Sequence, residues 1–217
     1  MGALLRLTLA CCLTAICGGC ISGMGGSASA PREKTPAEVP PPADWVQNVT
    51  FPEGLERPAP AREADILAAC EALLSDDFGD RTRGSRALLA YGEPAIPYLG
   101  HRVSSTGLGP DPNCSHCIVI YGIVEELPAS RVSVHLDSPY PIVRIAAAEA
   151  AGERDLDELA PALTRRLDDD ELEVRRAAVT ALRRMTRQFL GYRANDTPEA
   201  RRPAIELWER ETGAADG

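Results

Sequence analysis

Two cysteines separated by two residues form the cluster with the clearest chemical potential in this chain, in the segment Cys114-Ser115-His116-Cys117. Two thiols at this spacing could close a disulfide, exchange electrons with another dithiol, or lend two sulfurs to a metal ion. The segment stands at the start of an expected helix, where the pKa of a thiol is lowered. We therefore treat Cys114 and Cys117 as a candidate disulfide or redox pair.

The context of the pair excludes some roles and leaves others open. A c-type haem attachment is excluded because the histidine precedes the second cysteine. A structural zinc framework lacks a second Cys/His pair, so we assign no metal ligands. A thioredoxin-like site would need a strand before the motif, where residues 109–113 are typical of a loop. The alternatives are a disulfide within the pair or from one member to Cys70, inert buried thiols, and a redox or metal site.

The rest of the chain contains no pattern typical of an enzyme. No Gly-rich loop is placed to hold a phosphate, and Lys34 is the only lysine, which excludes a Ser-x-x-Lys motif in the C-terminal part. Carboxylates are abundant, but they fall in turns that we expect to be solvated. We therefore expect no catalytic residues, no cofactor and a non-catalytic protein.

Charge provides a weaker hint about partners. The net charge of −9 argues against non-specific binding of nucleic acid. Arginines nevertheless gather in the C-terminal half, where Arg183, Arg184 and Arg187 form a candidate basic face for an acidic partner or lipid headgroups. The alternative is that these arginines lie on solvent-exposed helix faces and bind no partner.

The N-terminus has the features of an export signal. Arg6 is the only charged residue among the first thirty, and it precedes an apolar run from Leu7 to Ile16. This run is much shorter than the ~20 residues of a spanning helix. Small residues then lead to Cys20, and the segment Cys17-Gly18-Gly19-Cys20 resembles the lipobox of bacterial lipoproteins. The alternative is an ordinary signal cleaved near Ala28 or Ala30.

The resemblance to lipoproteins implies a cellular location and a membrane anchor. Residues 1–19 would be the signal peptide, and Cys20 would carry diacylglycerol and palmitate as the mature N-terminus, which anchors the chain to the membrane. Because Ile21 is not an aspartate, the sorting rules of that family imply the periplasmic face of the outer membrane in a Gram-negative host.

Residues 20–60 are expected to form a disordered tether, because they are rich in Pro, Gly and Ala and poor in bulky apolar side chains. The stretch Trp45–Phe51 breaks this pattern and could dock on the domain, bind a partner or simply be linker.

Residues 61–213 are expected to form one helical domain. Apolar residues recur at helical spacing, as in Ile66, Ala69, Cys70 and Leu73, and sustained strand alternation is absent. Asp80 is expected to cap a second helix that ends at Gly92, and Thr197 starts the last helix.

Two stretches of this domain are copies of each other, offset by 31 residues. Residues 143–151 align with residues 174–182, and each copy pairs a Val-Arg step with an alanine-rich stripe. A fixed period of this kind indicates stacked helix pairs. With the looser Gly92-Glu93-Pro94-Ala95-Ile96-Pro97 hinge, these units resemble HEAT-type helical repeats.

The resemblance implies an all-α fold, an α-solenoid of about four HEAT-like helix pairs after an N-terminal capping helix. It also implies that the arginine after each valine pairs with an acid of a neighbouring unit, Arg144 with Asp137 and Arg175 with one of Asp168 to Asp170. The expected function is a lipid-anchored scaffold that binds an envelope protein or peptide, on the face lined by the second helices. The alternative is a periplasmic thiol-redox or metal-binding protein that uses Cys114 and Cys117.

Overall fold

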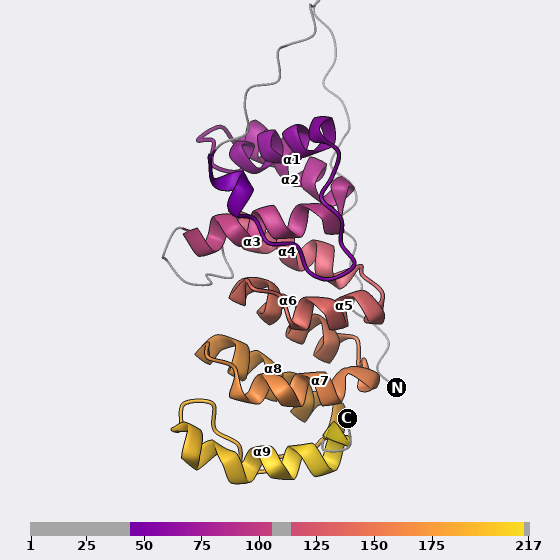
Figure 1. The fold of residues 1–217 in the computed structure, drawn as a ribbon, viewed down its shortest axis with the longest axis vertical. Helices are drawn as coiled ribbons and strands as arrows, with labels where there is room; N and C mark the ends of the chain where they lie inside the picture. Colours follow the sequence, from indigo (N-terminus) through magenta and orange to yellow (C-terminus); the bar gives the residue numbers. More distant parts are fainter. Residues whose placement is uncertain (1–43, 106–113, 215–217) are drawn as a thin grey trace, which may run out of the picture. The chain divides into compact units, whose positions relative to one another are not determined.

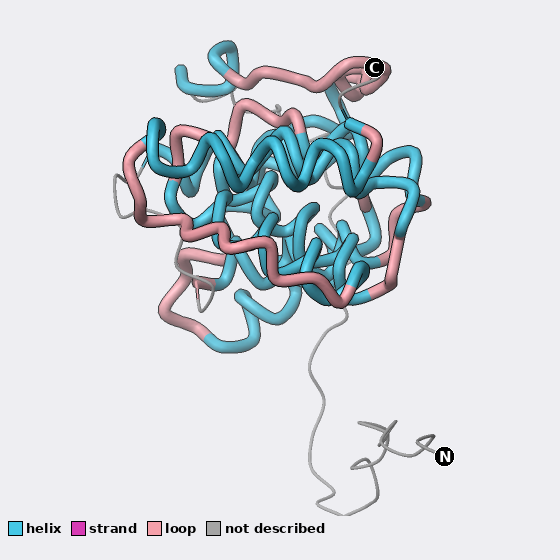
Figure 2. Tube along the Cα trace, turned by 90° about the horizontal axis from the view of Figure 1, so that it is seen from below, coloured by secondary structure: helices cyan, strands magenta, loops and turns pink. Residues whose placement is uncertain are grey.

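The computed structural model describes residues 44–105 and 114–214. The expected signal peptide, the lipidation site Cys20 and most of the expected tether lie outside these residues. Within the described ranges the chain is all helical, with cyan helices joined by pink loops and no strand (Figure 2). None of the described helices has the length and apolar character needed to cross a membrane.

Nine α-helices follow one another through the described ranges. Their bounds are α1 Pro60–Ala72, α2 Phe78–Tyr91, α3 Ile96–Ser105, α4 Ser115–Glu125, α5 Ala129–Leu136, α6 Pro141–Glu153, α7 Ala160–Arg165, α8 Leu172–Thr186 and α9 Pro198–Thr212. Short 3-10 turns stand before α3 (η2, Glu93–Ala95) and on both sides of α7 (η3, Asp157–Leu159, and η4, Arg166–Asp168).

The helices stack as successive pairs in two layers (Figure 1). The even-numbered helices α2, α4, α6 and α8 pack on one another in one layer, and the odd-numbered helices lie in the other. Grouped by the repeated sequence, the pairs are α2/α3, α4/α5, α6/α7 and α8/α9, with α1 beside α2 at the N-terminal end. This is the α-solenoid that the sequence predicts, because no single pair could bury its apolar face alone.

The two sequence copies lie in close contact in the stack. Val143 and Ala147 of α6 and Val174 and Ala178 of α8 have no exposed surface, as their repeated spacing predicts. A Cβ atom added at Gly152 would lie 2.7 Å from the Cα atom of Ala181. The backbones of α6 and α8 therefore touch, and only small residues allow them to do so.

The helix ends agree with the sequence in most places and differ in one. The second helix ends at Gly92, whose φ of 68° is a conformation that glycine adopts readily. Asp77, and not Asp80, caps its start, since the Asp77 carboxylate accepts the backbone N–H of Asp80 at 2.8 Å. The prediction for Asp80 was thus one turn too late, because both aspartates precede the same apolar pattern.

The folded part begins earlier than residue 61. The turn η1 (Asp44–Asn48) buries Val46, and the chain that follows buries Val49. Trp45 stacks on His101 of α3 with 5.4 Å between ring centroids, and Phe51 meets Tyr98 of the same helix edge-on at 5.5 Å.

Polar contacts fix the same segment along its length. The backbone N–H of Thr50 donates to the hydroxyl of Tyr140 at 2.8 Å, and the Arg57 guanidinium donates to the carbonyl of Val46 at 3.2 Å. We call residues 44–57 the N-terminal strap, since they run across α3 (Figure 1). Of the three roles open to Trp45–Phe51, the structure shows docking on the domain, and the expected tether does not extend to residue 60.

The contact at Gly152 yields a matched pair of substitutions. Gly152→Ala forces the α6 and α8 backbones apart and is expected to lower the free energy of unfolding by about 1–3 kcal/mol. Gly122→Ala in α4 would meet only the flexible end of Leu89, so it should be neutral or stabilise the helix by up to about 1 kcal/mol. Urea unfolding followed by circular dichroism measures both, and equal effects would contradict the close approach.

Candidate functional site

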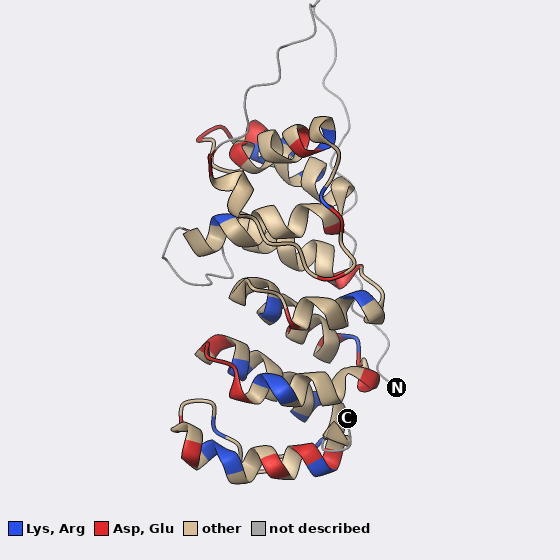
Figure 3. Ribbon diagram, in the orientation of Figure 1, with Lys and Arg blue, Asp and Glu red and all other residues tan. Residues whose placement is uncertain are grey.

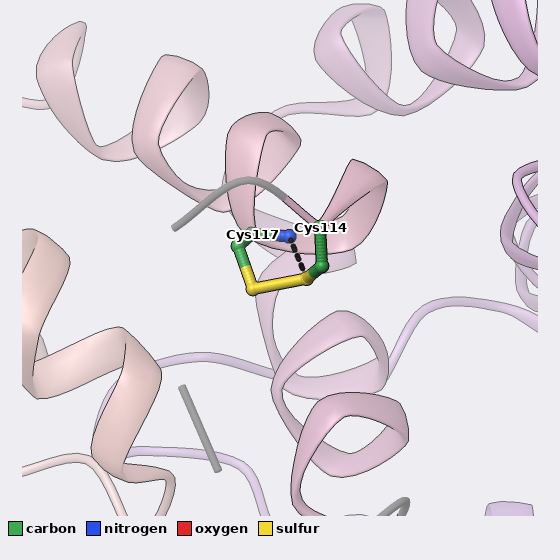
Figure 4. The surroundings of a disulfide bond; sticks show 2 residues. All are labelled: Cys114 and Cys117. Atoms are coloured by element: carbon green, nitrogen blue, oxygen red, sulfur yellow. Dashed lines mark hydrogen bonds between the residues drawn. A yellow bond between two sulfur atoms is a disulfide. The ribbon is translucent and has the colours of Figure 1, made fainter. Parts of the chain in front are cut away.

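The cysteine pair lies at the start of α4, joined as a disulfide (Figure 4). Cys114 is the N-cap residue, with extended backbone angles, and its sulfur accepts the backbone N–H of Cys117 at 3.1 Å. The bond therefore closes within the pair, and neither member is linked to Cys70.

The two cysteines differ in exposure. Cys117 is fully buried, whereas Cys114 keeps part of its surface in solvent. Cys70 is a free, buried thiol on α1, and burial, followed by the charge of Glu71, raises its pKa to about 12. Cys70 is thus protonated at neutral pH and unreactive, while Cys114 is the member of the pair that another molecule can reach.

No metal site is evident around the pair. Among residues 44–105 and 114–214, no group of three or more His, Cys, Asp and Glu side chains is placed to hold a metal ion. The ring of His116, between the two cysteines in sequence, is buried, and burial lowers its pKa. Neutral His116 therefore belongs to the packed first turn of α4.

The arginine after the first repeated valine forms an ion pair between units. Arg144 holds Asp169 through two hydrogen bonds, Nε to Oδ2 at 2.9 Å and Nη2 to Oδ1 at 2.8 Å. Both side chains are largely buried. The expected pairing of Arg144 with Asp137 is wrong, because Asp137 pairs instead with Arg166 at 3.0 Å. The carboxylate that Arg144 binds thus lies in the turn before α8, and not in the turn between α5 and α6.

The second repeated arginine acts differently. Arg175 donates to the backbone carbonyls of Asp169 and Asp170, at 2.6 and 2.9 Å, and to that of Ala194 at 3.0 Å. The expected ion pair with a carboxylate of residues 168–170 is therefore replaced by contacts to the backbone. Both arginines fix the turn before α8, which is a structural role.

The candidate basic face contains fewer free cations than its sequence suggests. Arg183 stacks over the ring of Phe189 at 4.0 Å and donates to the carbonyl of Tyr192 at 2.7 Å. Burial lowers its pKa. Arg184 and Arg187 remain exposed. The basic face stays a prediction, carried by these two residues.

The even-numbered helices also expose apolar side chains that the sequence does not single out. Leu89 of α2 and Ile118 of α4 are 47% and 58% exposed, and Leu89 lies against α4 at Gly122, one turn after Ile118. Beside them, a pocket of about 410 Å³ opens between α4, α6 and α8, and its lining residues are Tyr121, Ile145, Glu149, Glu173, Arg176, Ala177 and Thr180. We call this surface the even-helix face.

Charge is distributed unevenly along the stack (Figure 3). The helices α3 and α4 each carry one charged residue, Arg102 and Glu125, whereas α8 carries four arginines beside a single glutamate and α9 carries several charges of both signs. Along the even-helix face, the nearly uncharged helix α4 is therefore followed, beyond α6, by the strongly charged helix α8. Sequence patterning alone cannot find such a surface, because it does not tell which apolar side chains neighbouring helices leave uncovered.

A buried polar cluster joins α5 to the turn before α3. The Glu93 carboxylate lies 2.8 Å from His135 Nε2 and 2.8 Å from Arg131 Nε. His135 has no exposed surface, and its Nδ1 atom has no hydrogen-bond partner among the described residues. Burial lowers the pKa of His135, opposed by the bond to Glu93. The cluster is structural and secures the register of successive odd-numbered helices.

Residues 130–212 match the family model for HEAT repeats. The match runs from α5 to α9 and includes both sequence copies. No curated protein and no solved structure matches the chain. The chain is therefore similar to HEAT-like helical repeat proteins over its C-terminal part, and the same two-layer packing continues through α1 to α4.

Removing one partner of the buried ion pair should be costly. Arg144→Ala leaves the buried Asp169 carboxylate with only the more distant Arg166 guanidinium at 3.6 Å, so the free energy of unfolding is expected to fall by up to about 3 kcal/mol. The control Arg176→Ala breaks an exposed pair with Glu173 and should cost less than about 1 kcal/mol. Similar losses for both variants in chemical denaturation would refute a structural role for Arg144.

Stability should depend on pH through the histidines. The pKa values of His101, His116 and His135 are all lowered from 6.5, with burial as the largest cause. The unfolded chain therefore binds more protons below pH 6.5, and stability should fall there by up to about 1.4 kcal/mol per pH unit for each histidine. His135→Gln should make the fall measured between pH 7 and pH 5 shallower. An unchanged slope would mean that His135 does not contribute.

Proposed function

We propose that this protein is a non-catalytic scaffold, anchored to the cell envelope by a lipid on Cys20, whose helical repeats bind an envelope protein or peptide. HEAT repeats are commonly protein-interaction scaffolds, and stacked repeats present extended surfaces suited to this task. The lipobox-like segment before Cys20 supports the anchor and a location on the periplasmic face of the outer membrane.

The strap changes which face we propose for binding. The expected face is lined by the second helices of the pairs, but the strap already occupies α3 through Trp45, Val46 and Phe51. Near Gly54 it also comes close to Arg131 of α5. The first half of the odd-numbered layer is thus occupied by the chain itself, so we place the binding surface on the even-helix face.

The observation that carries this proposal is that α4 exposes Ile118, with Leu89 against the same helix, and three residues later contributes Tyr121 to the pocket. Monomeric soluble proteins expose single apolar side chains freely, but apolar groups beside a pocket with a polar rim are typical of an interaction site. Tyr121, Ile145 and Ala177 offer an apolar lining, and Glu149, Glu173 and Arg176 offer charge.

The charges suggest the chemistry of the partner. Arg176 is paired with Glu173 at 2.7 Å, so this acid is already neutralised. The Glu149 carboxylate is hydrogen-bonded to Tyr121. Its partial removal from water raises the pKa of this carboxyl group, although the residue still has solvent-exposed surface. A lysine or arginine of the partner would hold Glu149 in its ionised form. We propose a protein segment that combines apolar side chains with at least one cation.

In-cell cross-linking of the lipidated protein, followed by mass spectrometry, tests the face. Leu89→Glu combined with Ile118→Glu should abolish capture of a discrete, saturable envelope protein. Phe78→Glu is the matched control, because Phe78 is 75% exposed at the start of α2 and does not line the pocket. The control should capture the same protein as the wild type.

Two other outcomes would reject the even-helix face. Capture that survives the double variant but is lost with Arg184→Glu and Arg187→Glu would assign binding to the basic face. If the lipidated protein captures nothing above the background of a strain that lacks this chain, the scaffold proposal itself is rejected.

The anchor is tested separately through Cys20. The wild-type chain should enter the membrane fraction and carry a lipid mass at residue 20, whereas Cys20→Ser should leave that fraction and lack the lipid mass. A mature N-terminus after Ala28 or Ala30 in the wild type would show an ordinary signal peptide instead.

A further inference from the structure

The Cys114–Cys117 disulfide does not connect different elements of the fold. It joins the N-cap of α4 to a residue within the first turn of the same helix, with a sequence separation of three. A disulfide stabilises mainly by restraining the unfolded chain, and this effect is smaller for short loops than for long ones. The bond therefore adds little to the stacking that holds the repeats together.

The pair is also chemically asymmetric. The sulfur of Cys117 is buried in the core, while Cys114 is partly exposed. Only Cys114 can be approached by another molecule. Its sulfur also accepts the backbone N–H of Cys117 at 3.1 Å, and it stands at the positive end of the helix dipole. Both features favour a negative charge on Cys114 once the disulfide is opened.

We propose that this disulfide is redox active and accepts two electrons from the dithiol of another protein, with Cys114 as the sulfur that is attacked. A thiolate of the partner attacks the sulfur of Cys114, which forms a mixed disulfide and releases Cys117 with the electron pair of the broken bond. The second partner thiolate then attacks the partner sulfur of the mixed disulfide and releases Cys114. The partner leaves with a disulfide, and its two protons end on Cys117 and Cys114.

The direction of transfer follows from the stability of the reduced form. A disulfide oxidises better when its reduced state is stabilised, and the N-cap position does this for the Cys114 thiolate. In the reduced state Cys114 can keep its cap on α4, because the N–H bond to its sulfur does not require the disulfide. Cys70 takes no part, since it is buried on another helix with a raised pKa.

The test uses the full chain in detergent and a synthetic two-cysteine peptide as the dithiol probe. The folded chain should oxidise the reduced peptide and itself gain two thiols, read by site-resolved alkylation, while its circular dichroism stays unchanged. In the reduced chain, Cys114 should alkylate about tenfold faster than Cys117 at neutral pH. Transfer that occurs only after the chain is unfolded by denaturant would overturn the proposal.

Single-cysteine variants identify the attacked sulfur. With the disulfide form of a probe peptide that carries a single cysteine, Cys117→Ser should accumulate a mixed disulfide through Cys114, because neither the chain nor the attached peptide then keeps a resolving thiol. Cys114→Ser should accumulate none, and Cys70→Ala should behave as the wild type. Equal trapping by both single variants would refute the assigned role of Cys114. Should either variant lose its helical signal, the alkylation rates of the reduced wild type decide the question.

Discussion

The contact between α6 and α8 sets the geometry of the stack around it. Gly152 and Ala181 let the two backbones touch, and a larger residue at either position would push the units apart. This spacing brings the turn before α8 within reach of Arg144, so the buried ion pair with Asp169 depends on it. The pocket between α4, α6 and α8 depends on the same spacing. The buried ion pair and the candidate binding surface thus both depend on the packing of small side chains between α6 and α8.

The repeats could be predicted because their signal is local. Val143 and Val174 begin copies of one alanine-rich stripe, and a stripe at helical spacing needs a neighbouring helix whichever neighbour that is. The partner of Arg144 could not be predicted in the same way. Asp137 and Asp169 are both acids of neighbouring units, and the choice between them depends on the stacking register, which no single stretch of sequence specifies.

The candidate sites show the same division. The spacing of Cys114 and Cys117 predicted a candidate disulfide or redox pair, but whether one member pairs with Cys70 on α1 instead is decided by the tertiary fold. The strap was ambiguous because Trp45 and Val46 stand among prolines and small residues that favour a linker. The even-helix face had no signal, since Leu89 and Ile118 look in sequence like core residues of their helices.

The strap also determines how mechanical load enters the domain. The chain passes from Asp44 through the stacked ring of Trp45 and the buried Val46 before it reaches α1. Tension applied from the N-terminal side therefore acts first on these docked side chains, which can peel away one after another. The helix α1 and the core behind it feel the force only after the strap has been released. Undocking of the strap thus protects the packing of the repeats from a force that pulls on the N-terminal side of the chain.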